Sequence, residues 1–141
     1  MAKRNIYVDG IWDLFHTGHL KNIKSIKKLD GKDNFLIVGV VSDKDASNYK
    51  RQPIIEEKQR VEIIKSLKYV DKVIENCPLV INEEFLEKNN IDLVCHGFLE
   101  KADFDKQKEF FQVPISLNKF RQVPYNYGIS TTDIIQKIKN L

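Results

Sequence analysis

The sequence predicts an α/β fold, a Rossmann-like doubly wound parallel sheet of about five strands with helices on both faces. Short apolar runs alternate with stretches of helical period along the 141 residues. The run at residues 35–41 is apolar throughout, which is typical of a strand covered on both faces. No repeat, low-complexity tract or second hydrophobic unit interrupts this pattern, so residues 1–141 are expected to form one domain.

The first half of the chain supplies the expected centre of the sheet. Its elements are expected to be a strand at 6–8, a helix at 18–29, the central strand at 35–41, a turn at 42–45 and a loop at 48–55. The helix is amphipathic, because apolar side chains recur at three-residue steps between lysines. Pro53 interrupts the loop and excludes a regular element there.

The second half continues the alternation of strand and helix. Its elements are expected to be a helix at 56–67, a strand at 70–74, a helix from Asn82 to about residue 88, a strand at 91–95, a flap at 97–108, a strand at 112–117, a loop at 120–127 and a helix at 130–140. Asn82 is a suitable N-cap, and acidic residues follow it in the favourable first turn. Phe98 and Phe104 are expected to pack the charged, aperiodic flap on the body.

Composition excludes several classes of protein. Lys and Arg number 23 against 20 Asp and Glu, and a net charge of +3 spread along the chain does not favour nucleic-acid binding, whereas a small anionic ligand is compatible with it. No stretch approaches the ~18 apolar residues of a membrane span. No apolar signal region precedes the first strand, so the protein is expected to be cytoplasmic. Cys77 and Cys95 form no CxxC pair and are expected to be free thiols.

The segment His16-Thr17-Gly18-His19 lies where the first strand gives way to a helix. The N–H groups at a helix N-terminus lack intrahelical partners and attract phosphate. Gly18 would let a phosphate approach the backbone. Two imidazoles three residues apart could both donate hydrogen bonds to charge that develops during phosphoryl transfer. The alternatives are two histidines that satisfy turn backbone groups, or a metal-binding pair.

With the segment Gly128-Ile129-Ser130-Thr131-Thr132 opening the last helix, this motif resembles the cytidylyltransferase family. That family joins CTP to phosphocholine, phosphoethanolamine or glycerol 3-phosphate. The resemblance covers nearly the whole chain and implies a homodimer that uses Mg²⁺ together with CTP. The metal would be bridged by phosphate oxygens and water, so no protein ligand to it is assigned. The HxGH pattern also serves adenylyl transfer, so ATP remains an alternative to CTP.

The resemblance implies roles for individual residues. The catalytic residues would be His16, His19 and Lys50. The CTP-binding residues would be Gly10, Ile11, Trp12, Gly18, His96, Gly128, Ser130, Thr131 and Thr132. The substrate-binding residues would be Asp9, Asp13 and Arg60. Simpler explanations stay open for some of them: a solvated lysine for Lys50, a surface ion pair for Arg60, caps for the three hydroxyls and turn stabilisation for Asp13.

The sequence departs from the family pattern before the last helix. The family signature reads RTxGIST, whereas this chain has Tyr125-Asn126-Tyr127 ahead of Gly128. A permanently charged phosphate fork is therefore missing at this position, and whether Arg121 replaces it is left open.

The resemblance also bears on the acceptor. An aspartate at Asp9 favours an amine substrate over glycerol 3-phosphate. The phosphocholine branch carries a tryptophan where this chain has Leu79, and the segment at His96-Gly97 is closer to phosphoethanolamine enzymes. Phosphoethanolamine is therefore favoured, with phosphocholine next. The alternatives are a glycerol-3-phosphate cytidylyltransferase and a catalytically weak nucleotide-binding or dimerisation module of the same fold.

Overall fold

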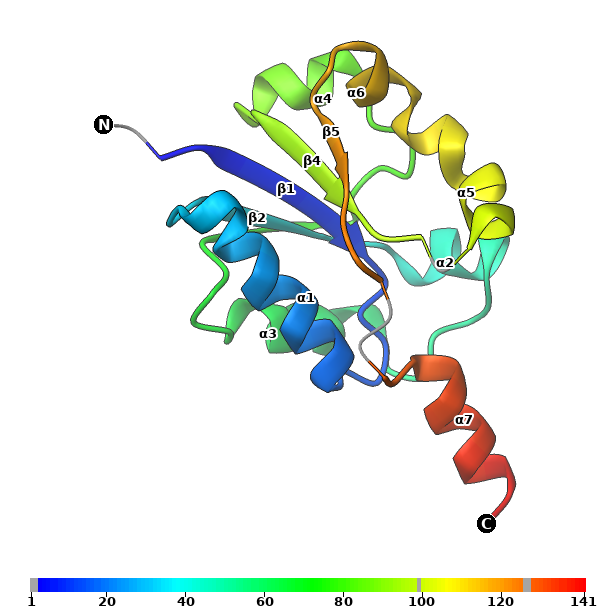
Figure 1. Cartoon of the computed structure of the whole chain (residues 1–141). Helices are drawn as coiled ribbons and strands as arrows, with labels where there is room; N and C mark the ends of the chain where they lie inside the picture. Colours follow the sequence, from blue (N-terminus) through cyan, green and yellow to red (C-terminus); the bar gives the residue numbers. More distant parts are fainter. Residues whose placement is uncertain (1–2, 99, 126–127) are drawn as a thin grey trace.

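Five parallel strands form one sheet in the order β3-β2-β1-β4-β5 (Figure 1). The computed structural model describes residues 3–98, 100–125 and 128–141. The strands are β1 (Asn5–Gly10), β2 (Phe35–Val40), β3 (Lys72–Glu75), β4 (Leu93–His96) and β5 (Phe120–Gln122). Every neighbouring pair runs parallel, and Val8 of β1 lies between Val38 and Cys95 in the register. The predicted fold class is confirmed.

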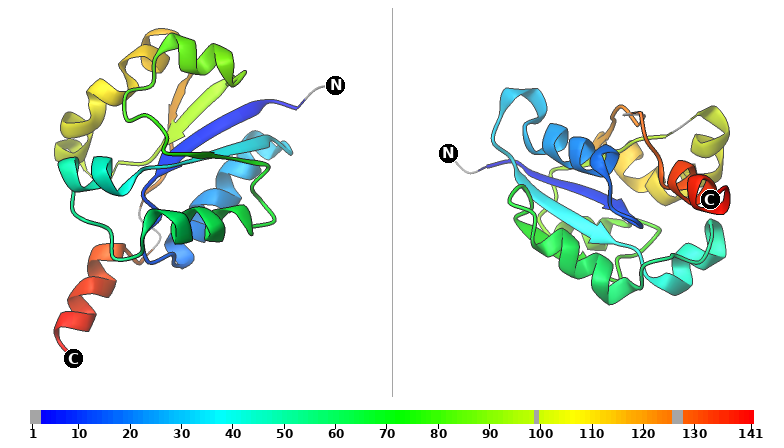
Figure 2. Two further views of the ribbon diagram at one scale, coloured as in Figure 1. Left: turned by 180° about the vertical axis from the view of Figure 1, so that it is seen from behind. Right: turned by 90° about the horizontal axis from the view of Figure 1, so that it is seen from below.

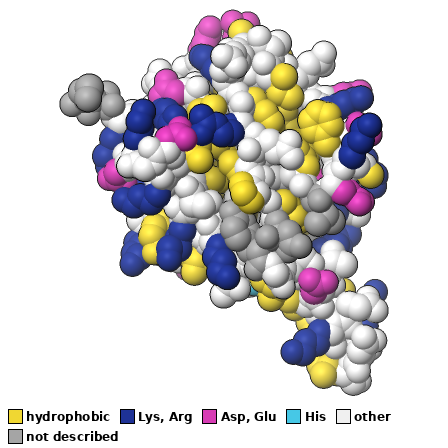
Figure 3. Space-filling model, in the orientation of Figure 1, with side chains coloured by type: hydrophobic (Ala, Val, Ile, Leu, Met, Phe, Trp, Pro, Cys, Tyr) yellow, Lys and Arg dark blue, Asp and Glu magenta, His cyan; other side chains and the backbone are white. Residues whose placement is uncertain are grey.

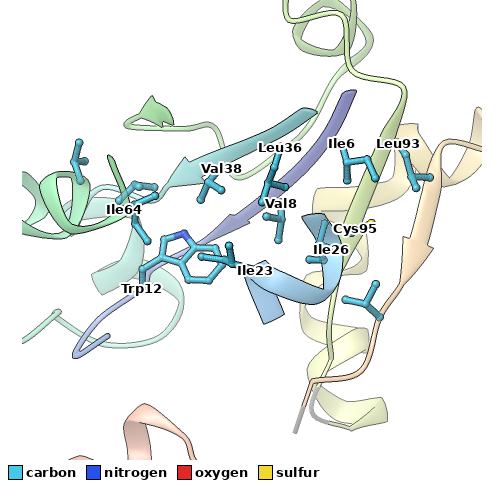
Figure 4. Close-up of a cluster of buried hydrophobic side chains, with 13 residues drawn as sticks. Ile6, Val8, Trp12, Ile23, Ile26, Leu36, Val38, Ile64, Leu93 and Cys95 are labelled. Atoms are coloured by element: carbon cyan, nitrogen blue, oxygen red, sulfur yellow. The ribbon is translucent and has the colours of Figure 1, made fainter. Parts of the chain in front are cut away.

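Helices cover both faces of this sheet (Figures 1 and 2). Successive strand residues point to opposite faces. On one face, α1 (Thr17–Lys27) and α3 (Glu57–Lys65) bury a cluster that includes Val8, Val38, Ile23 and Ile64 (Figure 4). On the other face, Tyr7 and Ile37 belong to a second cluster with residues of α4 (Glu83–Lys88), the short 3-10 helix η2 (Lys108–Phe111) and α6 (Gln112–Ser116).

Several predicted elements are confirmed at their ends as well as in their type. Asn82 caps α4, its side-chain oxygen accepting from Phe85 N at 2.8 Å. Ser130 caps α7 (Thr131–Lys139) through Asp133 N at 3.1 Å. The predicted first helix ends two residues early, at Lys27, and a 3-10 turn, η1 (Leu29–Gly31), follows it. Cys77 and Cys95 are both buried and free.

The predicted turn at 42–45 and the predicted irregular flap at 97–108 are wrong, because each contains a helix. Ser42 is an N-cap rather than part of a turn, and α2 (Asp43–Tyr49) takes up the start of the predicted loop. The predicted flap contains α5 (Lys101–Gln107), a helix with no buried residue of its own and therefore no apolar period to detect. Phe98 and Phe104 do pack on the body, as predicted, with ring centroids 5.1 Å apart.

The predicted last strand and the loop after it are also wrong. Residues 112–116 are helical, and Pro114 lies in the first turn of α6, where a missing N–H leaves no intrahelical bond broken. The fifth strand is instead β5, at the start of the predicted loop, where Phe120 pairs with Val94 of β4. Three residues at a sheet edge are too few to show an alternating pattern.

The order of the strands reverses between β1 and β4. From β1 the chain builds outward through β2 and β3 on one side, and through β4 and β5 on the other. In open α/β sheets ligands bind outside the carboxyl ends of the strands at such a switch point. Here those ends are Gly10 and His96.

The last helix, α7, extends away from the sheet (Figures 1 and 2), and hydrophobic atoms remain visible along it in Figure 3. None of its residues is buried, and Ile138 is 55% exposed. Among the residues that the structure describes, no helix combines the length and apolar character needed to cross a bilayer.

Candidate active site

The connection from β1 to α1 is held in a strained shape. Trp12 and Leu14 have φ of 59° and 48°, a left-handed conformation that costs a non-glycine residue roughly 1–2 kcal/mol. Trp12 is only 5% exposed, and its indole N–H donates to the carbonyl of Gly39 at 2.9 Å. Burial and this hydrogen bond therefore fix the turn that leads into the two histidines.

The two histidines form a capping box at the start of α1. His16 Nδ1 accepts from the backbone N–H of Gly18 at 3.0 Å and of His19 at 3.4 Å. His19 Nδ1 accepts from the backbone N–H of His16 at 3.2 Å. Because a backbone N–H can only donate, each Nδ1 must be unprotonated, and in the neutral ring the proton lies on Nε2. Both imidazoles are thus set up as Nε2–H donors.

The charge state of these rings follows from their surroundings. Burial, followed by the charges of His16 and Lys50, lowers the pKa of His19 to about 3. Burial also lowers the pKa of His16, against the opposing effect of Asp133. The two rings stack with centroids 3.8 Å apart, a distance at which two cations would repel. At neutral pH both side chains are uncharged hydrogen-bond donors.

The start of α7 lies against the capping box, so the two sequence motifs meet in space. Thr131 Oγ1 donates to the carbonyl of Asp13 at 3.0 Å and lies 3.4 Å from His16 Nε2. A Cβ on Gly18 would lie 2.8 Å from the His16 ring and 2.9 Å from the carbonyl of Ile129. Glycine is therefore required at this position by the close approach of the α7 segment, which leaves no room for a side chain.

The loop after α2 closes the same region from a third side. Asp13 fixes it, because its carboxylate accepts from the backbone N–H groups of Ile54 and Ile55, each at 2.8 Å. Partial removal from water and the neighbouring Arg51 charge lower the pKa of Lys50. Arg51 Nη1 donates to Thr132 Oγ1 at 3.3 Å. Two cations thus face the first turn of α7 and the histidines.

The inner end of the region is a chain of polar side chains. Asp9, which is 8% exposed, lies 3.3 Å from His96 Nδ1. His96 Nε2 lies 3.1 Å from Gln107 Oε1, and the Gln107 amide donates to Asp103. This chain joins the carboxyl ends of β1 and β4 to α5 and places the Asp9 and Asp103 carboxylates in the same cleft as the cationic loop.

These segments line one cleft of about 580 Å³. Most of the residues that the sequence assigns to the site lie on its wall: Asp9, Gly10, Ile11, Trp12, Asp13, His16, Gly18, His19, Lys50, His96, Ser130, Thr131 and Thr132. The residues come from β1, the start of α1, the loop after α2, the end of β4 and the start of α7. The switch point, the two motifs and the cleft therefore coincide.

A sequence profile described as cytidylyltransferase-like matches residues 7–137. The chain belongs to the cytidylyltransferase-like family. This finding confirms the resemblance drawn from the two motifs, which lie at the opposite ends of the matched region.

Named relatives of this cytidylyltransferase-like chain are longer proteins. Choline-phosphate cytidylyltransferase 2 of Arabidopsis thaliana is 37% identical over 94% of this chain and 44% of its own length. Ethanolamine-phosphate cytidylyltransferase of Dictyostelium discoideum is 30% identical over 94% of this chain and 36% of its own length. The chain thus spans less than half the length of these curated relatives. A crystal structure described as the lipopolysaccharide core biosynthesis protein from Thermoplasma volcanium is 25% identical, with a TM-score of 0.66, over 89% of this chain and 99% of that one.

Two predicted site residues of this cytidylyltransferase-like domain lie outside the cleft wall. Arg60 is fully buried behind it and donates to the carbonyls of Ile11, Val41 and Ile55 and to Asp43 Oδ1, at 2.6–2.9 Å. It is therefore neither a surface ion pair nor a wall residue. Gly128 has φ of 88°, a left-handed conformation that favours glycine, in the turn before α7.

The departure from the family signature is only partly described, because residues 126–127 lie outside the described ranges. Tyr125 is described and lines the cleft. Arg121 pairs with Asp30 at 2.8 Å on the exposed surface, away from the cleft wall, so it does not replace the missing phosphate fork. Leu79 packs against Val41, Ala46 and Cys77 and does not line the cleft either.

Sequence reasoning missed several residues of the wall. Those with polar side chains are Asn22, Tyr49, Arg51, Glu100, Asp103, Lys106, Gln107, Tyr125 and Asp133. Arg51 could have been found as a second cation beside Lys50, in a loop that follows a central strand. The residues of α5 carried no such signal, because the element itself was not recognised as a helix.

Proposed function

We propose that this domain transfers CMP from CTP to an amino-alcohol phosphate, giving a CDP-alcohol and pyrophosphate. The observation that supports this most directly is the meeting of two neutral Nε2–H imidazoles, the N-terminus of α7 and the cations Lys50 and Arg51 in one cleft. Hydroxyl and N–H donors with adjacent cations suit a triphosphate, and the cleft lies at the position where α/β sheets bind nucleotides.

The chemistry needs no covalent intermediate. A phosphate oxygen of the acceptor attacks the α-phosphorus of CTP, a new P–O bond forms, and the bond to the β-phosphate oxygen breaks to release pyrophosphate. Negative charge builds on the α-phosphoryl oxygens, and His16 and His19 are placed to donate hydrogen bonds to it. Lys50, whose charge acts on His19, neutralises the same centre. Positioning and charge stabilisation carry the reaction.

Mg²⁺ is part of this proposal. Among residues 3–98, 100–125 and 128–141 no three His, Cys, Asp or Glu side chains form a metal-binding group. Mg²⁺ commonly retains waters and binds through substrate phosphates, so the ion would enter with CTP and be held mainly by the nucleotide. When bound, it would neutralise phosphate charge.

The acceptor proposed first is phosphoethanolamine. Asp9 at the inner end of the cleft, with Asp103 and Gln107 nearby, supplies oxygen acceptors for the three N–H donors of a primary ammonium. Phosphocholine is the second candidate, because Tyr49 and Tyr125 also line the cleft and can offer aromatic faces to a quaternary ammonium. Relatives named for each substrate match the chain.

A pyrophosphate-release assay tests the proposal. CTP and ATP are each crossed with phosphoethanolamine, phosphocholine and glycerol 3-phosphate, in the presence of Mg²⁺. We expect turnover with CTP and phosphoethanolamine that His16→Ala reduces by at least about 100-fold, as for loss of a transition-state donor. Omission of Mg²⁺ should abolish turnover. No release in any combination, with CTP binding retained in calorimetry, would instead identify a nucleotide-binding module.

The family resemblance also supports a homodimer. We expect sedimentation equilibrium to give a mass of about twice 16.5 kDa at micromolar concentration. A monomer that turns over CTP would remove dimerisation from the proposal without affecting the proposed reaction.

A further inference from the structure

The four arginines of this chain do not share the same environment. Arg4 and Arg121 pair with Asp30, and Arg60 pairs with Asp43, at 2.6–3.0 Å. Arg51 makes no salt bridge with any residue in the part of the chain that the structure describes. It is also the arginine that lines the cleft. Its charge is therefore available to an anion bound there.

The surroundings of Arg51 locate this charge. Arg51 is partly exposed, and its guanidinium donates to Thr132 Oγ1 in the first turn of α7 at 3.3 Å. Its charge lowers the pKa of Lys50, although burial is the larger cause. The Arg51 charge also lowers the pKa of Tyr125, although burial and the Asp103 charge raise that pKa overall. The guanidinium thus lies where the loop after α2, the start of α7 and Tyr125 converge.

Lys50 and Arg51 lie beside different parts of the cleft. Lys50 acts on His19, and His16 lies against Thr131. Arg51 reaches Thr132, one residue further along α7 than the threonine that lies against His16. If the α-phosphate of CTP binds at the histidines, the β- and γ-phosphates would therefore lie beside Arg51.

We propose that Arg51 binds the two terminal phosphates of CTP, the group that leaves as pyrophosphate. This inference rests on the proposed function. A guanidinium presents a planar fork that matches phosphate oxygens in a bidentate manner and stays charged at every working pH. Arg51 thus supplies, from the loop after α2, the permanent charge that the family signature places at the position of Tyr125. Of the acidic side chains that line the cleft, Asp133 accepts from the backbone N–H of Ser130, and Asp103 accepts from the Gln107 amide.

Calorimetric titration tests this proposal with three probes: pyrophosphate, CTP and CMP, each with Mg²⁺. Loss of a charged, bidentate contact should weaken binding roughly 10- to 100-fold, so we expect this loss for pyrophosphate and CTP in Arg51→Ala. CMP lacks the terminal phosphates, and its affinity should not change. Arg51→Lys should be intermediate, because it keeps the charge without the fork. Arg121→Ala, which removes an arginine outside the cleft, is the matched control.

A rescue variant sharpens the test. Tyr125→Arg in the Arg51→Ala background places a guanidinium at a neighbouring position of the cleft wall and should recover at least about 10-fold in pyrophosphate affinity. Equal weakening of CMP and CTP by Arg51→Ala, or no change in either, overturns the proposal. Binding differences without turnover by the wild type would refute only the proposed reaction. Turnover with unchanged pyrophosphate binding in Arg51→Ala would refute only the role of Arg51.

Discussion

Arg60→Ala is the substitution that most sharply separates a structural role from a substrate-binding one. The Arg60 side chain has no exposed surface, and its guanidinium joins the segments after β1 and β2 to α2 and α3. Its removal takes the guanidinium donors from three carbonyls and from Asp43 Oδ1, while Asp43 Oδ2 still accepts from the backbone N–H of Glu57. The Asp43 side chain is 38% exposed, so solvent screens its share of the loss. Each buried acceptor left unpaired costs about 1–3 kcal/mol, so the three carbonyls alone give an expected loss near 4 kcal/mol, a large part of a typical domain stability.

The expected change can be measured by heat and by urea. An unfolding entropy of about 2.1 cal/mol/K per residue gives about 0.3 kcal/mol/K for 141 residues, so 4 kcal/mol corresponds to a fall in Tm of about 13 °C. The urea midpoint should fall with an unchanged m-value. Arg121→Ala is the control, because it breaks an exposed ion pair and should change Tm little. A normal Tm with a raised KM for the acceptor would show instead that Arg60 contacts substrate and that its buried geometry is not retained in solution.

Three further predictions concern the histidines and the turn around them. His19 binds a proton below pH 6.5 in the unfolded chain but only near pH 3 in the folded one, so acid destabilises the wild type. Between these two pH values its unfolding free energy should fall, relative to that of His19→Gln, by about 1.4 kcal/mol for each unit that the pH is lowered. Urea midpoints that change with pH in parallel for the two proteins would contradict this. Gly18→Ala pushes a methyl into the His16 ring and the Ile129 carbonyl, so turnover should fall at least about 10-fold while circular dichroism stays native. Asp13→Ala leaves two backbone N–H groups unpaired and should cost about 1–3 kcal/mol in urea unfolding and raise the KM for CTP; an unchanged KM would separate this loop from the nucleotide.

The sheet and the cleft were predictable because they depend on local patterns. Residues 35–41 could hardly be anything except a buried strand, and the HxGH and GIST segments each mark a helix start with suitable caps. The family resemblance assigned both motifs to CTP, which implied that segments at the two ends of the chain lie together.

The errors arise where tertiary contacts decide the structure. Pro114 was read as an interruption of a strand, but the first turn of α6 tolerates it, and the segment is helical because Phe111 and Val113 pack under the sheet. β5 exists because the edge of β4 is available to pair with it, which no local pattern of three residues reveals. Arg60 was assigned to substrate binding, with a surface ion pair as the simpler alternative. Full burial was not expected because a charged side chain is rarely fully buried, and only the carbonyls around it explain the exception.

The projecting α7 helix has a consequence for how the molecule opens. In the part of the chain that the structure describes, the hydrogen bonds that join this helix to the body all lie in its first turn. Because none of its side chains is buried, it can detach without exposing the core, at a small fraction of the free energy of global unfolding. The same first turn forms part of the cleft wall. Local detachment of this one short helix is therefore enough to disrupt one side of the cleft, while the sheet and the rest of the cleft wall stay folded.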